Sequence, residues 1–440
     1  TESAPKKDEV KADNPFAAFF NASSVKEEEN KVEAPAEALP KEAKTGLEID
    51  DEHLDFSQVE KIGSATGSMT EACAVANFLA TSVKEDVLTL CFDVGGSTTD
   101  ISALTRHGDN KLLIKQNSIH FAAQDVIKAA GKYRKLNEVL INAQKHEPIF
   151  GLQEKYSPDK AAYYFDKVVD LISDNSERLT NFYTELAAKC PELMSANLYV
   201  TGMIMFYAGQ ITRKLVTMSR HQLKDWRPVV LIKFAGKGSR IFDWWYSSSP
   251  DVAQGYYTML YAVGMGAANA QQMKDYIERV SIELKDDKRA DVKYEVSMGL
   301  ITDGANLSRL LQDSIEIIGE DGYHLPDPQD PSKRVELPFD KAITSAMFEQ
   351  MGGKFGYNNK LKAPPRFKKF FDIFNFSTKE FFDTSFDRVE EAMTDMDLDK
   401  FISEDEDYRA ALNRTAGFDF VAPIIIMEAG CFLKEILKVL

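Results

Sequence analysis

The clearest alternation of hydrophobic and polar positions lies between Leu88 and Leu104. Apolar residues occupy every second position up to Phe92, and the apolar pattern resumes at Ile101. A period of two is typical of β-strands, and the Gly-Gly-Ser-Thr segment at residues 95–98 separates the two halves. The pattern therefore predicts two strands joined by a tight turn, that is, a β-hairpin with a polar tip.

Apolar residues at spacings of three and four predict helices on both sides of this hairpin. The expected helices cover Met69–Leu79, Gln124–Lys145, Ala161–Lys189, Met205–Leu223 and a segment through Met265 and Asn269 that follows the aromatic insert Phe242–Tyr246. Shorter apolar runs predict strands at Ser57–Gly63, Asn197–Thr201 and Val229–Phe234, and a second hairpin formed by Val280–Leu284 and Val292–Val296. Strands that alternate with helices in this way indicate an α/β fold, with a parallel or mixed sheet flanked by helices.

Composition divides the chain into three parts. Residues 1–55 are rich in Lys, Glu, Ala and Pro and too poor in apolar residues to form a core, so we expect a disordered linker. Its aromatic cluster, Asn14–Phe20, is either a short docking motif or a chance cluster. Residues 56–320 hold the α/β pattern. Residues 321–440 begin with an acidic, Pro-rich linker, Asp321–Pro338, and continue as a mainly helical domain. We expect protein partners to bind the C-terminal helical region or the N-terminal tail.

Charge and cysteine content narrow the functional class. The net charge of −16 and the pI near 5.0 argue against a nucleic-acid partner, because phosphate backbones attract Lys and Arg clusters. The most apolar segment, Phe418–Leu440, is interrupted by charges and predicts an amphipathic helix, so no membrane span is expected. Cys73, Cys91, Cys190 and Cys431 lie far apart, and no C-x-x-C pair or signal peptide is present. Reduced thiols in a cytoplasmic protein are the expected consequence.

The tip of the predicted hairpin carries the best candidate chemistry. Gly95 and Gly96 permit a tight turn whose backbone N–H groups form an anion site, and residues 97–99 add hydroxyl donors. Asp93 and Asp100 flank the turn, where a hydrated Mg²⁺ would need carboxylates. Phosphate is the anion that such a turn usually binds. The spacing alone is equally compatible with a hairpin whose polar tip faces water.

The octapeptide Asp93–Asp100 resembles the second phosphate loop of the actin, heat-shock chaperone and sugar kinase ATPase superfamily, most closely its chaperone form, D-L-G-G-G-T-F-D. Further motifs follow in the family's order. Met69–Leu79 is similar to the first connecting helix, and Lys293–Ile301 to the second. Ser118–Asp125 resembles the segment that follows the phosphate hairpin. The strand and glycine turn of Pro228–Ile241 are similar to the adenosine motif. In one departure, Ala122 and Ala123 stand where the family usually has two glycines.

This resemblance implies an actin-like (ribonuclease H-like) lobe that binds ATP and Mg²⁺. The implied phosphate ligands are Gly95, Gly96, Ser97, Thr98 and Thr99. The implied catalytic acids are Asp93, Asp100 and Glu71; the first two would hold Mg²⁺ through its waters, and Glu71 would lie near the attacking water. The residues implied to flank the adenine are Gly236, Gly238, Ser239 and Arg240.

The superfamily builds its cleft from two lobes, and the first lobe supplies a D-x-G-T-T phosphate loop that has no counterpart in this chain. The resemblance therefore implies a second lobe whose complement lies upstream or in another chain, with ATP hydrolysis only when both are present. The expected function is an ATP-driven conformational switch of chaperone or filament type. The alternative is a catalytically inactive actin-fold scaffold; a sugar kinase ranks third because no sugar-binding carboxylate is recognisable.

Overall fold

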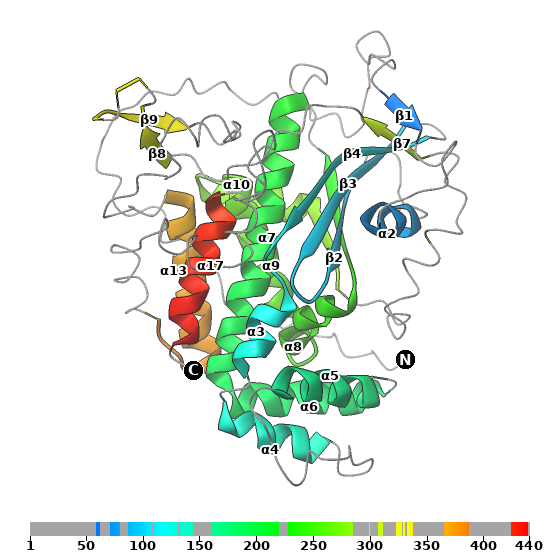
Figure 1. Ribbon diagram of the computed structural model, residues 1–440, viewed down its shortest axis with the longest axis vertical. Coiled ribbons are helices and arrows are strands. Elements are labelled where there is room, and N and C mark those ends of the chain that lie inside the picture. Colours follow the sequence, from blue (N-terminus) through cyan, green and yellow to red (C-terminus); the bar gives the residue numbers. More distant parts are fainter. Residues whose placement is uncertain are drawn as a thin grey trace, which may run out of the picture.

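The computed structural model describes residues 59–61, 71–79, 87–107, 110–130, 133–143, 160–173, 175–219, 228–284, 299, 307–310, 323–327, 329–330, 332–337, 365–386 and 424–438 (Figure 1). The predicted linker at residues 1–55 lies outside them. So do Val292–Val296 and, apart from Gly299, the segment Lys293–Ile301.

A seven-stranded mixed sheet forms the centre of the described part of the chain. In spatial order its strands are β1 (Val59–Lys61), β7 (Leu307–Leu310), β4 (Asn110–Ile119), β3 (Thr99–His107), β2 (Val87–Val94), β5 (Val229–Ala235) and β6 (Val280–Glu283). β2, β3 and β4 form an antiparallel meander, and β5 and β6 continue the sheet beyond β2 in parallel with it. At the other edge, β7 runs parallel to β4 and β1 antiparallel to β7. The predicted α/β class with a mixed sheet is confirmed.

The two faces of the sheet differ because successive residues of a strand point to opposite sides. In β2, the alternate residues from Leu88 to Val94 belong to the large hydrophobic core. Cys91 faces the other side, in a small cluster with Cys73 and Ala76 of helix α2 (Glu71–Leu79). Figure 1 shows α2 on one side of the sheet and α3, α7 and α9 on the other.

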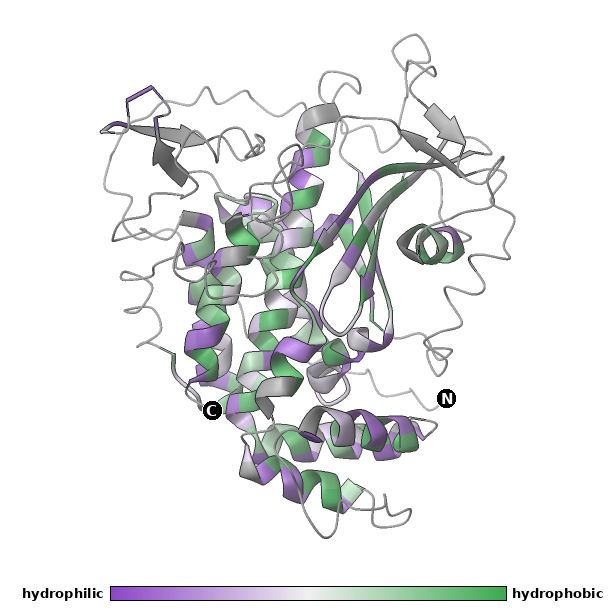
Figure 2. Cartoon of the chain, viewed as in Figure 1, coloured by the Kyte–Doolittle hydropathy of each residue, from purple (hydrophilic) through white to green (hydrophobic). Residues whose placement is uncertain are grey.

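The core side carries most of the described helices. They are α3 (Ala123–Ala130), α7 (Pro191–Ser219), α9 (Pro250–Gly264), α10 (Ala270–Arg279) and, directly after β5, the 3-10 helix η4 (Lys237–Phe242) and α8 (Asp243–Tyr246). The helices α4 (Arg134–Ala143), α5 (Ala161–Ile172) and α6 (Ser176–Lys189) are grouped beyond the turn of the β2–β3 hairpin (Figure 1). Figure 2 shows hydrophobic and hydrophilic residues mixed along α5 and α6, as expected of helices with one face towards solvent.

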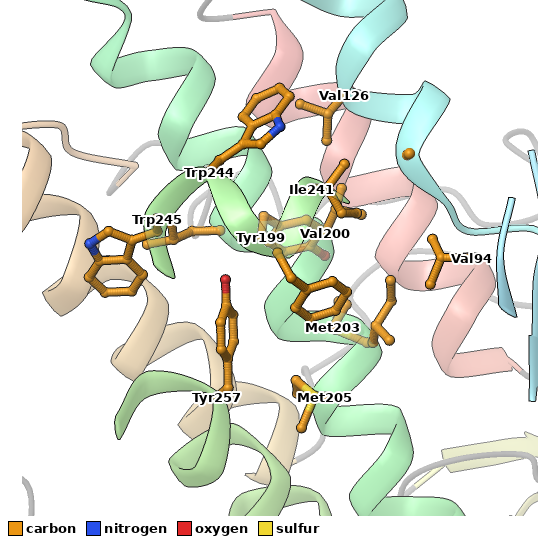
Figure 3. Close-up of a cluster of buried hydrophobic side chains, with 14 of the residues drawn as sticks. Val94, Val126, Tyr199, Val200, Met203, Met205, Ile241, Trp244, Trp245 and Tyr257 are labelled. Atoms are coloured by element: carbon orange, nitrogen blue, oxygen red, sulfur yellow. The ribbon is translucent and has the colours of Figure 1, made fainter. Parts of the chain in front are cut away.

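The centre of the core is helix α7. Its residues Tyr199, Val200 and Met203 lie among side chains of α3, α8 and α9, with Trp244 nearby (Figure 3). The hydroxyl of Tyr199 donates a hydrogen bond of 3.2 Å to the carbonyl oxygen of Ala429, in the C-terminal helix α17 (Ile424–Leu437). The core therefore joins the middle of the chain to its C-terminal helix.

Helix α13 (Pro365–Phe382) completes this core together with α17. Phe367 and Phe370 of α13 are fully buried, and their rings stack with centroids 5.6 Å apart. Phe370 also meets the Tyr199 ring of α7 edge to face at 5.6 Å. The described helices of residues 321–440 thus pack into the same core as the sheet, and the boundary predicted at residue 321 stays a prediction.

Several predicted elements differ from the structure. Asn197–Thr201, predicted as a strand, lies inside α7, because a helix buried on all sides lacks the polar stripe that would reveal its period. Asp321–Pro338, predicted as a linker, contains a hairpin of β8 (Tyr323–Pro326) and β9 (Arg334–Leu337). The single helix predicted over Gln124–Lys145 is divided into α3 and α4.

Two predictions about the chain's general character can be compared with the structure. The cysteines are all free, as predicted; Cys431 is partly exposed and the other three are buried. In the described residues, no helix combines the length and the apolar character that a membrane crossing would require.

Candidate functional site

The predicted hairpin is present, and its turn closes as the glycines suggested. The N–H group of Gly95 donates a 2.8 Å hydrogen bond to the carbonyl oxygen of Thr98. Val94 then pairs with Thr99, and Asp93 with Asp100, in the antiparallel register of β2 and β3. Because the Gly95 N–H closes the turn, the predicted role of phosphate donor falls to the N–H groups of Gly96, Ser97 and Thr98.

Asp93 and Asp100 lie directly opposite each other at the end of the hairpin. Both are partly exposed. Their positions in the alternation of β2 and β3 place them on the side of the sheet that α2 covers. Cβ atoms of opposed residues in an antiparallel pair are about 4.5–5.5 Å apart, and two like charges at that distance are destabilising. A hydrated divalent cation would relieve this repulsion, so the pair fits the predicted Mg²⁺ ligands. Among the described residues, no group of three or more His, Cys, Asp or Glu side chains could hold a metal ion by itself.

The second predicted glycine segment contacts the hairpin. β5 runs parallel to β2, with Ala235 paired to Asp93. Gly236 follows with a φ of +77°, and a Cβ atom added there would overlap Asp93 Oδ1. A Cβ atom added at Gly238 would overlap the carbonyl oxygen of Gly95. These two glycines therefore allow the two turns, far apart in sequence, to pack backbone against backbone at the carboxyl ends of β2 and β5.

Ser239 and Thr99 use their hydroxyls within the fold. Ser239 is buried, and its hydroxyl donates a 2.7 Å hydrogen bond to the carbonyl oxygen of Gly236. Thr99 is also buried and donates a 2.7 Å hydrogen bond to the carbonyl oxygen of Phe121. Both hydroxyls hold the shape of the turns, whereas Ser97 is exposed at the tip.

The start of helix α3 lies against the hairpin turn. The backbone N–H of Gln124 donates a 2.8 Å hydrogen bond to the carbonyl oxygen of Gly96. The side-chain amide of Gln124 covers Gly96, since a Cβ atom added there would lie 2.6 Å from Gln124 Nε2. Ser97 Oγ lies 3.5 Å from Gln124 Oε1. Ala122 and Ala123, at the positions where the family usually has glycines, are buried in the core.

Arg240 and Lys237 form ion pairs with a carboxylate of helix α5. Arg240 Nη1 lies 2.8 Å from Asp170 Oδ1, and Lys237 Nζ lies 2.8 Å from Asp170 Oδ2. Burial acts to raise the pKa of Asp170, but the hydrogen bonds from the two cations outweigh it and leave this pKa below its ordinary value. Helix α5 is therefore tied to the turn that follows β5.

Glu71 opens α2, on the same side of the sheet as Asp93 and Asp100. Its side chain lies outside the described part of the structure. Further along α2, Asn77 donates a 2.9 Å hydrogen bond to the carbonyl oxygen of Gly299, and a Cβ atom added at Gly299 would overlap the backbone of Ala74. The two segments that resemble connecting helices therefore touch, with a glycine at the point of contact.

The geometry at the carboxyl ends of β2 and β5 thus joins three of the five predicted motifs: Asp93–Asp100, Ser118–Asp125 and Pro228–Ile241. No protein-family model matches this chain, and neither the curated proteins nor the solved structures yield a match. The candidate site therefore rests on its own residues.

Sequence reasoning missed Gln124, Asp170 and Lys237 as parts of this site. Gln124 lies in Ser118–Asp125, where the resemblance concerns the glycine positions, and nothing in that pattern marks its side chain. Asp170 follows Val169 on α5 and looks like an ordinary solvent-facing residue of an amphipathic helix. Its position depends on how α5 packs, which no local pattern reveals.

Proposed function

We propose that this chain is the nucleotide-binding lobe of a chaperone-like or actin-like ATPase that acts as a conformational switch. The observation that carries the proposal is the contact between the hairpin turn at Gly95–Thr98 and the glycine turn at Gly236–Arg240. In α/β sheets, ligands bind outside the carboxyl ends of the parallel strands, and the two glycine turns meet at that place in this chain.

The strand arrangement also supports this proposal. An antiparallel meander of β2, β3 and β4, continued by the parallel strands β5 and β6, is the arrangement expected of a ribonuclease H-like lobe. The contact of α2 with Gly299 agrees with the expectation that the connecting helices of such a lobe meet on one side of its sheet. A fold alone does not specify a function, so the residues of the two turns carry the chemical argument.

In the proposed mechanism, the N–H groups of Gly96, Ser97 and Thr98 bind the terminal phosphates. Bound Mg²⁺ would neutralise charge on the phosphate oxygens. Asp93 and Asp100 would orient the waters around that ion, and Glu71 would orient the water that attacks the γ-phosphate. Gly236 and Gly238 bring the turn after β5 against the hairpin. This turn would flank the purine, and Arg240 would pack on the base. The protein's contribution is then positioning and charge stabilisation, which phosphoryl transfer mainly requires.

The alternative is a scaffold that keeps the fold without turnover. One observation favours it: the side chain of Gln124 lies over Gly96, where a phosphate would approach the turn. This contact does not decide the matter, because Gln124 meets Gly96 with the flexible end of its side chain. A bound phosphate could therefore displace it without a change in the backbone.

Calorimetric titration with Mg-ATP tests the proposal and distinguishes it from the alternative. We expect the chain to bind Mg-ATP, and to hydrolyse it when a complementary first lobe is present. Asp93→Asn should then lower the turnover by orders of magnitude while weakening ATP binding much less, because the acid acts mainly in the transition state. Each tenfold loss of rate corresponds to about 1.4 kcal/mol of activation free energy.

Binding without turnover in the two-lobed assembly would favour the scaffold. If the chain binds no nucleotide, the resemblance to the ATPase superfamily concerns the fold and not the function.

A further inference from the structure

Asp170 lies outside every motif of the sequence, yet its carboxylate accepts hydrogen bonds from two residues of the turn that follows β5. The donors are Lys237 Nζ and Arg240 Nη1, each at 2.8 Å from a different carboxylate oxygen. These contacts join residues that are 67 and 70 positions apart in the chain. One carboxylate thus fixes the directions of two cationic side chains next to the proposed purine site.

The two cations differ in exposure. The side chain of Arg240 is 14% exposed, whereas those of Lys237 and Asp170 are about 40% exposed. The Lys237–Asp170 pair is exposed, and exposed ion pairs contribute about 0–1 kcal/mol to stability. The geometric effect of Asp170 is larger, because a guanidinium group held through its edge can still stack through a flat face.

We propose that Asp170 is a positioning residue of a purine nucleotide site, acting through Arg240. It holds the guanidinium group by its edge, so that a face of Arg240 is presented to the base. This inference rests on the proposed function, since Arg240 is assigned to the base there. It goes further by assigning helix α5, and Asp170 in particular, to the wall of the purine site. The chemical class of the ligand is a purine nucleoside triphosphate.

Two variants on α5 separate this role from a general charge effect. Asp170→Asn keeps the size of the side chain but leaves one acceptor oxygen for two cationic donors. Asp166→Asn, one helical turn earlier, is the matched control. Asp166 is half-buried and acts on Lys237 and Arg240 through its charge alone; burial, the largest influence, raises its pKa. Both variants remove one negative charge from the same helix, but only the first breaks the two hydrogen bonds.

The measurement compares the affinities of the full chain for Mg-ATP and for Mg-tripolyphosphate, which lacks the base and the ribose. The wild type should bind ATP more tightly than tripolyphosphate. Asp170→Asn should weaken ATP binding by about tenfold, the effect of a cation–π contact of about 1–2 kcal/mol, and leave tripolyphosphate binding unchanged. Asp166→Asn should change neither affinity by more than about twofold. Melting temperatures of both variants should stay close to that of the wild type.

The possible outcomes separate this inference from the proposed function. If Asp170→Asn weakens ATP and tripolyphosphate equally, Asp170 has a merely structural role and the inference is wrong. If Asp166→Asn has the same effect as Asp170→Asn, charge and not positioning is responsible, and the inference is again wrong. If the wild type binds both ligands equally well, the phosphate site stands and the purine site, with Asp170, is lost. If it binds neither, both proposals fail.

Discussion

A methyl group added at Gly96 and one added at Gly238 would meet different neighbours, although both glycines belong to the candidate site. At Gly96 it would meet the end of the Gln124 side chain, which can rotate away. At Gly238 it would overlap the backbone oxygens of Gly95 and Val94, which can move only if the hairpin moves. The same substitution therefore probes ligand binding at one position and the fold at the other.

We predict that Gly96→Val abolishes binding of Mg-ATP and leaves the fold largely intact, because its side chain would occupy the place of the phosphate. Gly238→Ala should lower the free energy of unfolding by about 1–3 kcal/mol, the usual cost of overpacking. Calorimetric titration and urea-induced unfolding measure the two effects. If a folded Gly96→Val protein still binds ATP, the turn at Gly96 is not the phosphate site.

The cysteines give a pH-dependent prediction at the same scale. Burial, partly offset by Lys233, raises the pKa of Cys91 from 9.0 to about 12, and burial likewise raises that of Cys190 to about 12. A pKa raised by folding stabilises the protein fully below the unfolded-state value, and this contribution is lost as the pH rises towards the folded-state value. The free energy of unfolding should therefore fall between about pH 9 and pH 12.

Alkylation followed by mass spectrometry checks the environment of these thiols. At neutral pH, Cys431 should react first because it alone is partly exposed, and the buried thiols should react only after unfolding. Rapid modification of Cys91 in the native protein at neutral pH would contradict the described packing of α2 on the sheet.

At the scale of elements, helices α7 and α9 pack closely through glycines. A Cβ atom added at Gly209 of α7 would overlap the carbonyl oxygen of Tyr261 and lie 2.8 Å from the backbone nitrogen of Met265. A Cβ atom added at Gly202, on the same helix, would meet side chains: it would lie 2.5 Å from Tyr256 Oη and 2.6 Å from Leu260 Cδ1. The first contact is with a backbone and the second with groups that can shift.

We predict that Gly209→Ala destabilises the protein more than Gly202→Ala does. Both changes gain about 1 kcal/mol of helix propensity, so the difference between them isolates the contact. Overpacking against the backbone at Gly209 should cost about 2–3 kcal/mol, and the cost at Gly202 should be smaller. Urea-induced unfolding of the two variants measures this difference. Equal midpoints for both would show that the α7–α9 contact is looser than described.

The comparison of sequence and structure is also clearest at the element scale. The hairpin of β2 and β3 was predictable because its period of two and its glycines are local signals. Asn197–Thr201 was wrongly predicted as a strand because its Tyr, Val and Thr residues favour strands, whereas packing on every side of α7 stabilises the helix. The pairing of Asp170 with Arg240 was not predictable, since it depends on the packing of α5 against a turn far away in sequence.

At the scale of the whole molecule, the sheet and the described helices of residues 321–440 share one core. Tyr199 of α7 contacts Phe370 of α13 and Ala429 of α17, while other residues of α7 pack towards the sheet. The candidate site lies where this core meets the carboxyl ends of β2 and β5. The resemblance implied that Gly95 and Gly236 belong to one site. Their turns lie together in the structure because β2 and β5 are parallel neighbours that end at the same edge of the sheet. The contact of the Gln124 side chain with Gly96 could be found only from the structure.

Hydrogen exchange of the full chain with and without millimolar Mg-ATP tests the central claim, nucleotide binding between the two turns, most directly. Bound phosphate should slow exchange of the N–H groups of Gly96, Ser97 and Thr98, and the purine should slow exchange in residues 236–240. Exchange in α10, at the far end of β6, should not change. The account predicts protection in both turns together. Unchanged exchange in both turns at saturating Mg-ATP, or protection confined to other elements, would contradict it.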